Sequence, residues 1–214
     1  MLNIPSIPDS EYKERVKKVQ KTMKNEGYDL ILCYGNEAEP QFVRYFSNYW
    51  PSFETAGVLI PQDGDAILLI GPESYTYASD RSKINEIYRL KAFRESSEPE
   101  YPGEKLKTFT DVIDKLMSGK SVKRFGVAGL PLMTIGVYEA LSDALSKHGN
   151  IEIEKADKVV NDIRMHKTEA EIECMRAAAR ITAETFDYVL QNIRVGMTEQ
   201  QVVGLALGKM HELG

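Results

Sequence analysis

Residues 55–71, TAGVLIPQDGDAILLIG, contain two short apolar runs separated by the pair Asp63-Gly64. Each run has the length of a buried strand, and an Asp-Gly pair tolerates the positive φ angles of a tight turn. The segment therefore predicts an antiparallel β-hairpin. That hairpin constrains the whole fold, because a sheet that includes it cannot be purely parallel.

Helices and strands alternate on both sides of this hairpin. Residues 10–27 place apolar side chains at helical spacing and end on Gly27, which suits a helix C-terminus. Further strands are expected at 29–35, 88–93, 124–130 and 151–155, and further helices at 73–81, 104–117 and 134–148. Strands that alternate with helices indicate an α/β fold, in which helices pack on a mixed sheet.

After Asp157 the pattern is helical only. Two capping boxes, Thr168 with Glu171 and Thr198 with Gln201, predict the starts of two helices. Their apolar stripes consist of Ile172, Met175, Ala179, Ala183, Phe186, Leu190 and Ile193 on the first helix, and of Val202, Leu205, Leu207 and Met210 on the second. Stripes of this width are typical of helices that cover a sheet. No strand follows them here, so we expect exposed apolar surface and association through it.

Composition and charge argue against some classes of binding partner. The 214 residues carry a formal net charge of −5, which argues against bulk attraction to nucleic acid or to an anionic membrane. Cys33 and Cys174 lie far apart in apolar runs, as free thiols in a reducing compartment do. The N-terminus lacks the order of a signal peptide, and the apolar runs are too short to span a bilayer. We therefore expect a cytoplasmic protein with no nucleic acid or membrane partner.

The C-terminal third carries a resemblance to a known family. The run DKVVNDIRMHKTEAEIECMRAAARIT, followed by IRVGMTEQQV, resembles the start of the catalytic domain in the creatinase, prolidase and aminopeptidase P family. The family's motif R-x-x-K-x-x-x-E corresponds to Arg164, Lys167 and Glu171, and its G-M-T-E to residues 196–199. Upstream, YDLILCYG, VRYFSNYW and VLIPQDGDAILLIG follow the order of elements in the family's N-terminal domain.

The resemblance implies two domains. Residues 1–156 would form a ribonuclease-H-like α/β domain of the creatinase N-terminal type, with a mixed sheet. Residues 157–214 would supply the first two helices of an incomplete α+β pita-bread catalytic domain. In the metal-dependent members, strands that follow these helices bind two divalent ions (Mn, Co or Zn) through aspartate, histidine and glutamate side chains.

The function that the resemblance implies is that of a whole parent protein. We expect the parent to be an Xaa-Pro peptidase of the prolidase or aminopeptidase P type, a homodimer that acts on proline-containing peptides. The present chain would end before the first metal ligand and be inactive alone, with no catalytic and no metal-binding residue of its own. Two alternatives stay open: a creatinase-like amidinohydrolase, and a non-catalytic pita-bread relative that binds peptides.

A census of histidines and motifs leads to the same expectation from the residues alone. The chain has three histidines, His148, His166 and His211, and none is part of an HExxH pair. A nucleophile elbow, a P-loop and a GxGxxG turn are also absent from the sequence. The residues therefore supply no set that is typical of a catalytic centre.

The aromatic segment QFVRYFSNYWPSF, residues 41–53, supplies the candidate site. We expect Phe42 and Phe46 to pack under the sheet. The candidates for a substrate wall or a dimer contact are Arg44, Tyr45, Tyr49 and Trp50. Amphipathic rings on a loop suit an interface, and in the family this loop leans toward the active-site mouth of a partner subunit.

Overall fold

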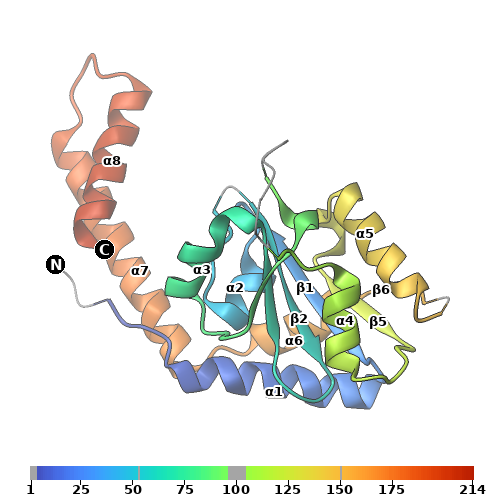
Figure 1. The fold of residues 1–214 in the computed structure, drawn as a ribbon. Helices are drawn as coiled ribbons and strands as arrows, with labels where there is room; N and C mark the ends of the chain where they lie inside the picture. Colours follow the sequence, from blue (N-terminus) through green and yellow to red (C-terminus); the bar gives the residue numbers. More distant parts are fainter. Residues whose placement is uncertain (1–3, 53, 96–104, 150) are drawn as a thin grey trace. The chain divides into compact units, whose positions relative to one another are not determined.

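The computed structural model in Figure 1 describes residues 4–52, 54–95, 105–149 and 151–214. Its contacts divide the chain into two units. The first unit, Asp9–Met165, holds the whole sheet. The second consists of His166–Gly214 together with the N-terminal segment that ends at Pro8.

A six-stranded sheet forms the centre of the first unit. The strands are β1 Leu30–Asn36, β2 Thr55–Pro61, β3 Ile67–Ile70, β4 Ile87–Arg89, β5 Phe125–Ala128 and β6 Ile153–Lys155, in the spatial order β4-β3-β2-β1-β5-β6. Strand β2 is antiparallel to β1 and to β3, whereas the other neighbours are parallel. The predicted hairpin and the mixed sheet of an α/β fold are confirmed.

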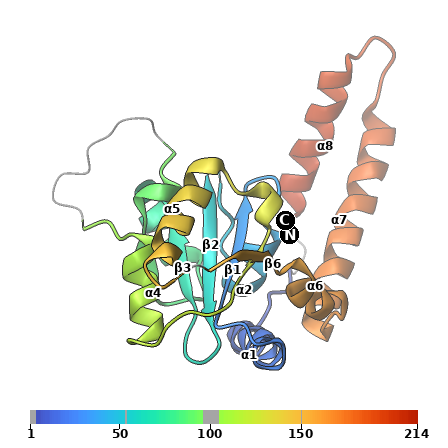
Figure 2. The same cartoon turned by 90° about the vertical axis from the view of Figure 1, so that its right-hand side faces the viewer.

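Helices cover both faces of this sheet. They are α1 Asp9–Glu26, α2 Gln41–Ser47, α3 Tyr75–Arg81, α4 Phe109–Met117, α5 Ile135–Ser146 and α6 Asp157–Met165, with short 3-10 turns at Pro72–Ser74, Lys91–Phe93 and Leu130–Leu132. Figure 2 shows α4 and α5 on one face, and α1, α2 and α6 on the other. Because successive strand residues point to opposite faces, Ile31 and Cys33 pack with the α1 side, and Leu30 and Leu32 with the α4 side.

Local signals explain where most elements end. Helix α1 ends before Gly27, whose φ of 81° lies in the left-handed region, and the Gly27 N–H donates to the Met23 carbonyl. In the hairpin, Gly64 has a φ of 102°. The turn is nevertheless longer than two residues, since β2 ends at Pro61 and β3 begins at Ile67. The lysines of α1 are exposed, as expected of a solvated face.

Two predicted elements differ from the observed ones. The strand expected at 88–93 is shorter, because the chain leaves β4 after Arg89 and turns through the 3-10 segment Lys91–Phe93. The helix expected from residue 104 begins at Phe109, because Thr108 caps it in a reciprocal box with Asp111. Residue 104 itself lies outside the described residues, as does most of the loop before it.

The second unit contains a helical hairpin of α7, Glu169–Asn192, and α8, Glu199–Leu213. Both predicted capping boxes are present, and Gly196 has a φ of 93° in the connection. The N-terminal segment packs on this hairpin, where the Cys174 thiol donates to the carbonyl of Pro5 at 3.5 Å. Local sequence signals are therefore sufficient to define this unit's helices.

The apolar stripes of this hairpin are largely exposed. The buried side chains of α7 are Ala177 and Thr185, which lie outside the predicted stripe. Within the stripe Phe186 is 63% exposed, and Met175, Leu190 and Ile193 are exposed as well. On α8, Leu207 and Met210 are exposed, whereas Val202 and Leu205 are half-buried. The expected exposed apolar surface is thus confirmed for the described residues; the association expected through it stays a prediction.

The compact units divide later than the domain boundary expected after residue 156. Helix α6 contacts α1 and β5, and its Val159 and Val160 belong to the core of the first unit. The units therefore separate after Met165. The assignment of residues 157–214 to a second domain family stays a prediction.

Substitution of Gly129 tests how much the close approach of its backbone to β1 matters for stability. Its φ is 91°, and a Cβ atom would lie 2.3 Å from the Tyr34 carbonyl oxygen, which belongs to rigid strand backbone. We expect Gly129→Ala to lower the free energy of unfolding by about 3 kcal/mol or more, since strain and a backbone clash add together. Denaturant unfolding measures this loss.

The matched control is Gly119→Ala. Gly119 has a similar φ of 84°, but a Cβ atom there would meet nothing within 4 Å. Only the left-handed strain of about 1–2 kcal/mol should remain. Equal losses for the two variants would show that the close approach at Gly129 has no energetic weight.

Candidate functional site

Among the described residues of the aromatic segment, Arg44 and Trp50 are exposed. Trp50 is 41% exposed, and its indole N–H donates to the Glu37 carbonyl at 3.0 Å. The Arg44 guanidinium carbon lies 4.6 Å from the centroid of the Trp50 ring, within the range of a cation–π contact. The pair therefore forms a fixed, amphipathic surface beside the loop that follows β1.

Tyr45 is half-buried and is held by two arginines. The Arg15 guanidinium carbon lies 4.3 Å from the Tyr45 ring centroid, and that of Arg164 lies 5.9 Å from it. Arg15 is buried, donates to the Tyr45 carbonyl at 2.8 Å, and pairs with Glu11 at 2.5 Å. Arg15 was not singled out from the sequence, although it shares the buried face of α1 with Tyr12 and Val19 at helical spacing.

The structure separates Tyr49 from the other three candidates. Asn48 has a φ of 59°, which ends α2 and turns the chain, so that the Tyr49 side chain is fully buried. The Tyr49 ring lies 5.5 Å from that of Tyr77. Tyr49 therefore lies in the core, and its assignment as a substrate-wall or dimer-contact residue stays a prediction. Phe42 and Phe46 lie in the core, as predicted.

The structure also contains a buried acidic residue, Glu54, that the sequence did not point to. Glu54 is only 3% exposed, at the entrance to β2, and both of its carboxyl oxygens are shielded from water. Burial raises the pKa of the Glu54 carboxyl to about 8, and the nearby Glu95 and Glu73 carboxylates add to this rise. A hydrogen bond from Ser74 is the strongest opposing effect, and one from the Gly71 N–H opposes the rise more weakly. No periodic signal marks Glu54, because it stands one residue before the strand.

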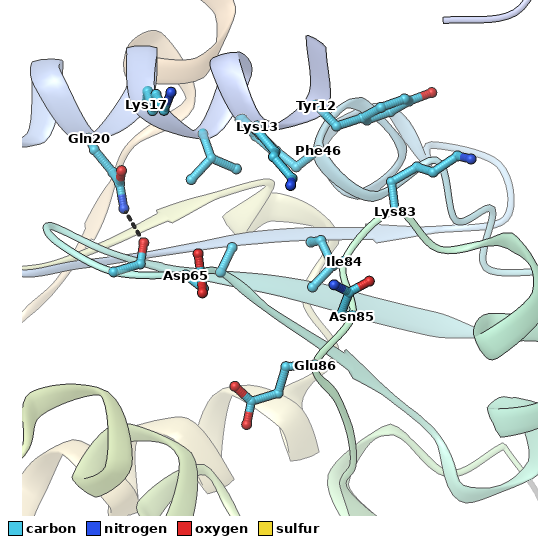
Figure 3. A pocket seen from close by; sticks show the side chains of 13 residues that line it. Tyr12, Lys13, Lys17, Gln20, Phe46, Asp65, Lys83, Ile84, Asn85 and Glu86 are labelled. Atoms are coloured by element: carbon cyan, nitrogen blue, oxygen red, sulfur yellow. Dashed lines mark hydrogen bonds between the residues drawn. The ribbon is translucent and has the colours of Figure 1, made fainter. Parts of the chain in front are cut away.

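The pocket shown in Figure 3 lies in the first unit between α1, the β2–β3 turn and residues 83–86. It has a volume of about 680 Å³, with Val16, Phe46 and Ile84 among its apolar side chains. Its charged groups largely pair with neighbours, since Lys17 contacts Glu14 and Lys83 contacts Asp9. Its described lining includes no serine, threonine, cysteine or histidine, so it holds no hydroxyl or thiol nucleophile paired with a histidine base.

The described residues do not fit a metal centre. Within them, no group of three or more histidine, cysteine, aspartate or glutamate side chains converges so as to hold a metal ion. His148 contacts the carboxylate of Asp114 at 3.1 Å. Burial also raises the pKa of the Cys33 thiol, which makes this cysteine a poor ligand and a poor nucleophile.

Over the described residues, none of the helices combines the length and the apolar character needed to cross a bilayer.

Comparisons with known proteins agree with one another. Residues 15–166 match the family described as the Creatinase/Prolidase N-terminal domain. The Xaa-Pro dipeptidase of Pyrococcus furiosus is 28% identical over 191 residues, which cover 89% of this chain and 46% of that protein.

Two solved structures show the same fold. The prolidase of Pyrococcus horikoshii aligns with a TM-score of 0.67 at 22% identity, over 94% of this chain and 49% of that one. The X-Pro aminopeptidase of Thermotoga maritima aligns with a TM-score of 0.70 at 22% identity, over 93% and 49%. The chain therefore spans about half the length of the relatives that it matches.

The raised pKa of Glu54 predicts how the stability of the folded state depends on pH. Its pKa is about 8 in the folded state, against about 4.3 in an unfolded chain. Between these values the folded state holds a proton that the unfolded state has released, so the stability of the wild type should fall as pH rises and level off above about pH 8. Glu54→Gln should remove this loss, which amounts to at most about 5 kcal/mol.

Urea unfolding across this pH range measures the effect. Glu139→Gln is the control, because Glu139 is exposed on α5 and the charge change is the same. The difference in stability between Glu54→Gln and the wild type should grow with pH, whereas that for Glu139→Gln should stay flat. Parallel curves for all three proteins would refute the assigned pKa.

Proposed function

The chain belongs to the creatinase/prolidase N-terminal domain family, and from this premise we propose that it is the N-terminal part of an Xaa-Pro peptidase. The parent protein would be a prolidase or an aminopeptidase P and would hydrolyse the bond before proline in peptides. The observation that carries the proposal is the similarity to an Xaa-Pro dipeptidase, which extends over 89% of the chain.

We assign residues 1–156 to the N-terminal domain and residues 157–214 to the opening of the pita-bread catalytic domain. The fold similarity supports this assignment, since it covers more than nine-tenths of the chain and so continues into α7 and α8. The residues that match the family's motif, Arg164, Lys167 and Glu171, lie in the second of these segments.

Metal chemistry is proposed for the parent protein and not for these residues. Two divalent ions, Mn, Co or Zn, would activate water and polarise the scissile carbonyl. The described residues offer no set that fits such ions, so the ligands would belong to another part of the parent. The role left to this chain is that of a domain that shapes the active-site entrance and the dimer.

We propose the surface of Arg44, Tyr45 and Trp50 as the part that serves this role. Arg44 and Trp50 are exposed, and the contacts with Glu37, Arg15 and Arg164 hold the cluster in place. An aromatic ring stacked with an arginine is typical of interface hot spots. A cytoplasmic location is part of the proposal and rests on the free thiols Cys33 and Cys174.

The complete product of the gene tests this function. With Mn²⁺ or Co²⁺ bound we expect hydrolysis of Xaa-Pro dipeptides, at least about tenfold faster than of Xaa-Ala dipeptides in kcat/KM, and loss of activity on metal chelation. Hydrolysis of creatine instead would favour the amidinohydrolase alternative. Peptide binding without hydrolysis at any metal concentration would favour the binding relative.

The dimer surface has its own prediction. We expect the 214-residue chain to dimerise, and Trp50→Ala to raise the dissociation constant of the dimer at least about tenfold, as the loss of an interface hot spot does. Sedimentation at several protein concentrations measures this constant. Tyr138→Ala is the matched control, since Tyr138 is also 41% exposed but lies on α5. A chain that stays monomeric, or equal effects of both variants, would contradict the assignment.

A further inference from the structure

The pocket between α1, the β2–β3 turn and residues 83–86, with a volume of about 680 Å³, has walls that are joined at both ends. The Gln20 side-chain amide donates to the Gly64 carbonyl at 2.7 Å and so ties the turn to α1 (Figure 3). At the other end, Lys83 contacts Asp9, the first residue of α1, at 2.8 Å. Because these contacts hold the walls in place, the cavity is largely preformed, as small-molecule sites usually are.

The charged residues of this lining fall into two groups. Three of them pair with groups that do not line the pocket: Lys17 with Glu14, Lys83 with Asp9, and Glu86 with Lys115. The other two, Lys13 and Asp65, are exposed, and neither has an ion-pair partner among the described residues. Within the described lining, the pocket therefore offers one unpaired cation and one unpaired anion.

These two residues stand on different walls of the cavity. Figure 3 shows the Lys13 side chain extending from α1 toward Asn85, and Asp65 on the turn across from α1. The side chains of Lys83 and Glu86 point away from the centre of the pocket. A ligand with a single charge would be attracted by one of the two unpaired residues and repelled by the other. A ligand that carries both charges can pair with both.

The pocket also has an apolar part. Val16 is half-buried and packs on the core of the first unit, and Ile84 and Ala66 are only 8% and 7% exposed. The position of Ile84 is fixed, since its backbone N–H donates to Ser82 Oγ at 3.0 Å. An apolar group of a ligand would leave water on contact with these side chains, and this burial favours binding.

We propose that this pocket binds a small zwitterion with an apolar body, a free amino acid with a large apolar side chain or a short apolar peptide. The ligand carboxylate pairs with Lys13, its ammonium group pairs with Asp65, and its apolar body contacts Val16 and Ile84. The inference rests on the pocket itself and does not depend on the proposed peptidase function.

Titration of the 214-residue chain with L-phenylalanine tests the proposal. At about pH 6.5 carboxylates are ionised and α-amino groups are protonated, so the probe carries both charges. We expect saturable one-to-one binding at low salt, with a dissociation constant on the order of 1 mM, because each exposed ion pair contributes little and salt screens it. By NMR, the largest chemical-shift changes should occur at Val16, Ala66 and Ile84.

Three related compounds each lack one part of the probe. Phenethylamine lacks the carboxylate, 3-phenylpropionate lacks the ammonium group, and glycine lacks the apolar body. Each should bind at least about threefold more weakly than phenylalanine, because one favourable contact is lost. Binding of phenethylamine or 3-phenylpropionate that is as tight as that of phenylalanine would show that the site does not select a zwitterion.

Two variants assign the charges to residues. Lys13→Gln should weaken phenylalanine binding at least about threefold and remove the preference for phenylalanine over phenethylamine, since the ligand carboxylate loses its partner. Asp65→Asn should weaken binding to the same extent and remove the preference over 3-phenylpropionate. Both residues are exposed, so both variants should fold.

The matched controls are Lys18→Gln and Asp63→Asn. Lys18 is an exposed lysine of α1, Asp63 is an exposed aspartate of the β2–β3 turn, and neither lines the pocket. Both control variants should bind phenylalanine as the wild type does. Two results would overturn the proposal: no saturable binding up to about 20 mM phenylalanine, or an affinity that either Lys13→Gln or Asp65→Asn leaves unchanged.

Glycyl-phenylalanine distinguishes the two sources of such a zwitterion, because a peptide bond separates its charges. If it binds more tightly than phenylalanine, the site takes the two ends of a short peptide. If it binds more weakly, the site takes a free amino acid. Failure of both probes counts against the site and leaves the peptidase assignment untouched, since that assignment is tested by hydrolysis in the complete gene product.

Discussion

The double pairing of β1 is the interaction on which the rest of the first unit depends. This strand is antiparallel to β2 over seven residue pairs and parallel to β5 over four. Both of its faces are buried, and its side chains contribute to both hydrophobic clusters. Because the strand is fixed on two edges and two faces, the loop that leaves it at Asn36 has a defined position. That loop places the Glu37 carbonyl where it accepts a hydrogen bond from the Trp50 indole N–H.

Two buried ionisable residues in this unit, Arg15 and Glu54, differ in how their removal from water is compensated. Arg15 is enclosed by Glu11, by the Tyr45 carbonyl and by two aromatic rings, so its charge is paired. Glu54 is equally buried, but its strongest charged neighbours are also acidic. A paired buried charge fixes the elements around it, and here it ties α1 to α2. A buried carboxyl among like charges instead retains a proton, as the raised pKa of Glu54 indicates.

The second unit shows what a helical hairpin can and cannot bury. Two helices in contact cover one narrow face of each, here the face that contains Ala177 and Thr185. A wider apolar stripe remains outside that contact, with Phe186 and Leu190 exposed in it. Such helices gain most of their stability from what covers the wider face. The contact between α7 and α8 therefore leaves most of this stripe uncovered.

The sequence by itself determined the α/β class, the mixed sheet and the order of elements, because hydrophobic period, Gly64 and the capping boxes act over a few residues. It also identified Arg44 and Trp50 as candidates, because they lie in a segment rich in aromatic residues. Only the tertiary structure showed that Tyr49 is buried, because Asn48 turns the chain. It also showed that Arg15 is buried, although the sequence does not distinguish this residue from the other basic residues of α1. It alone brought Glu54, Glu73 and Glu95 together. These residues come from separate segments, and their proximity depends on strand pairing between residues far apart in the chain, which no local pattern encodes.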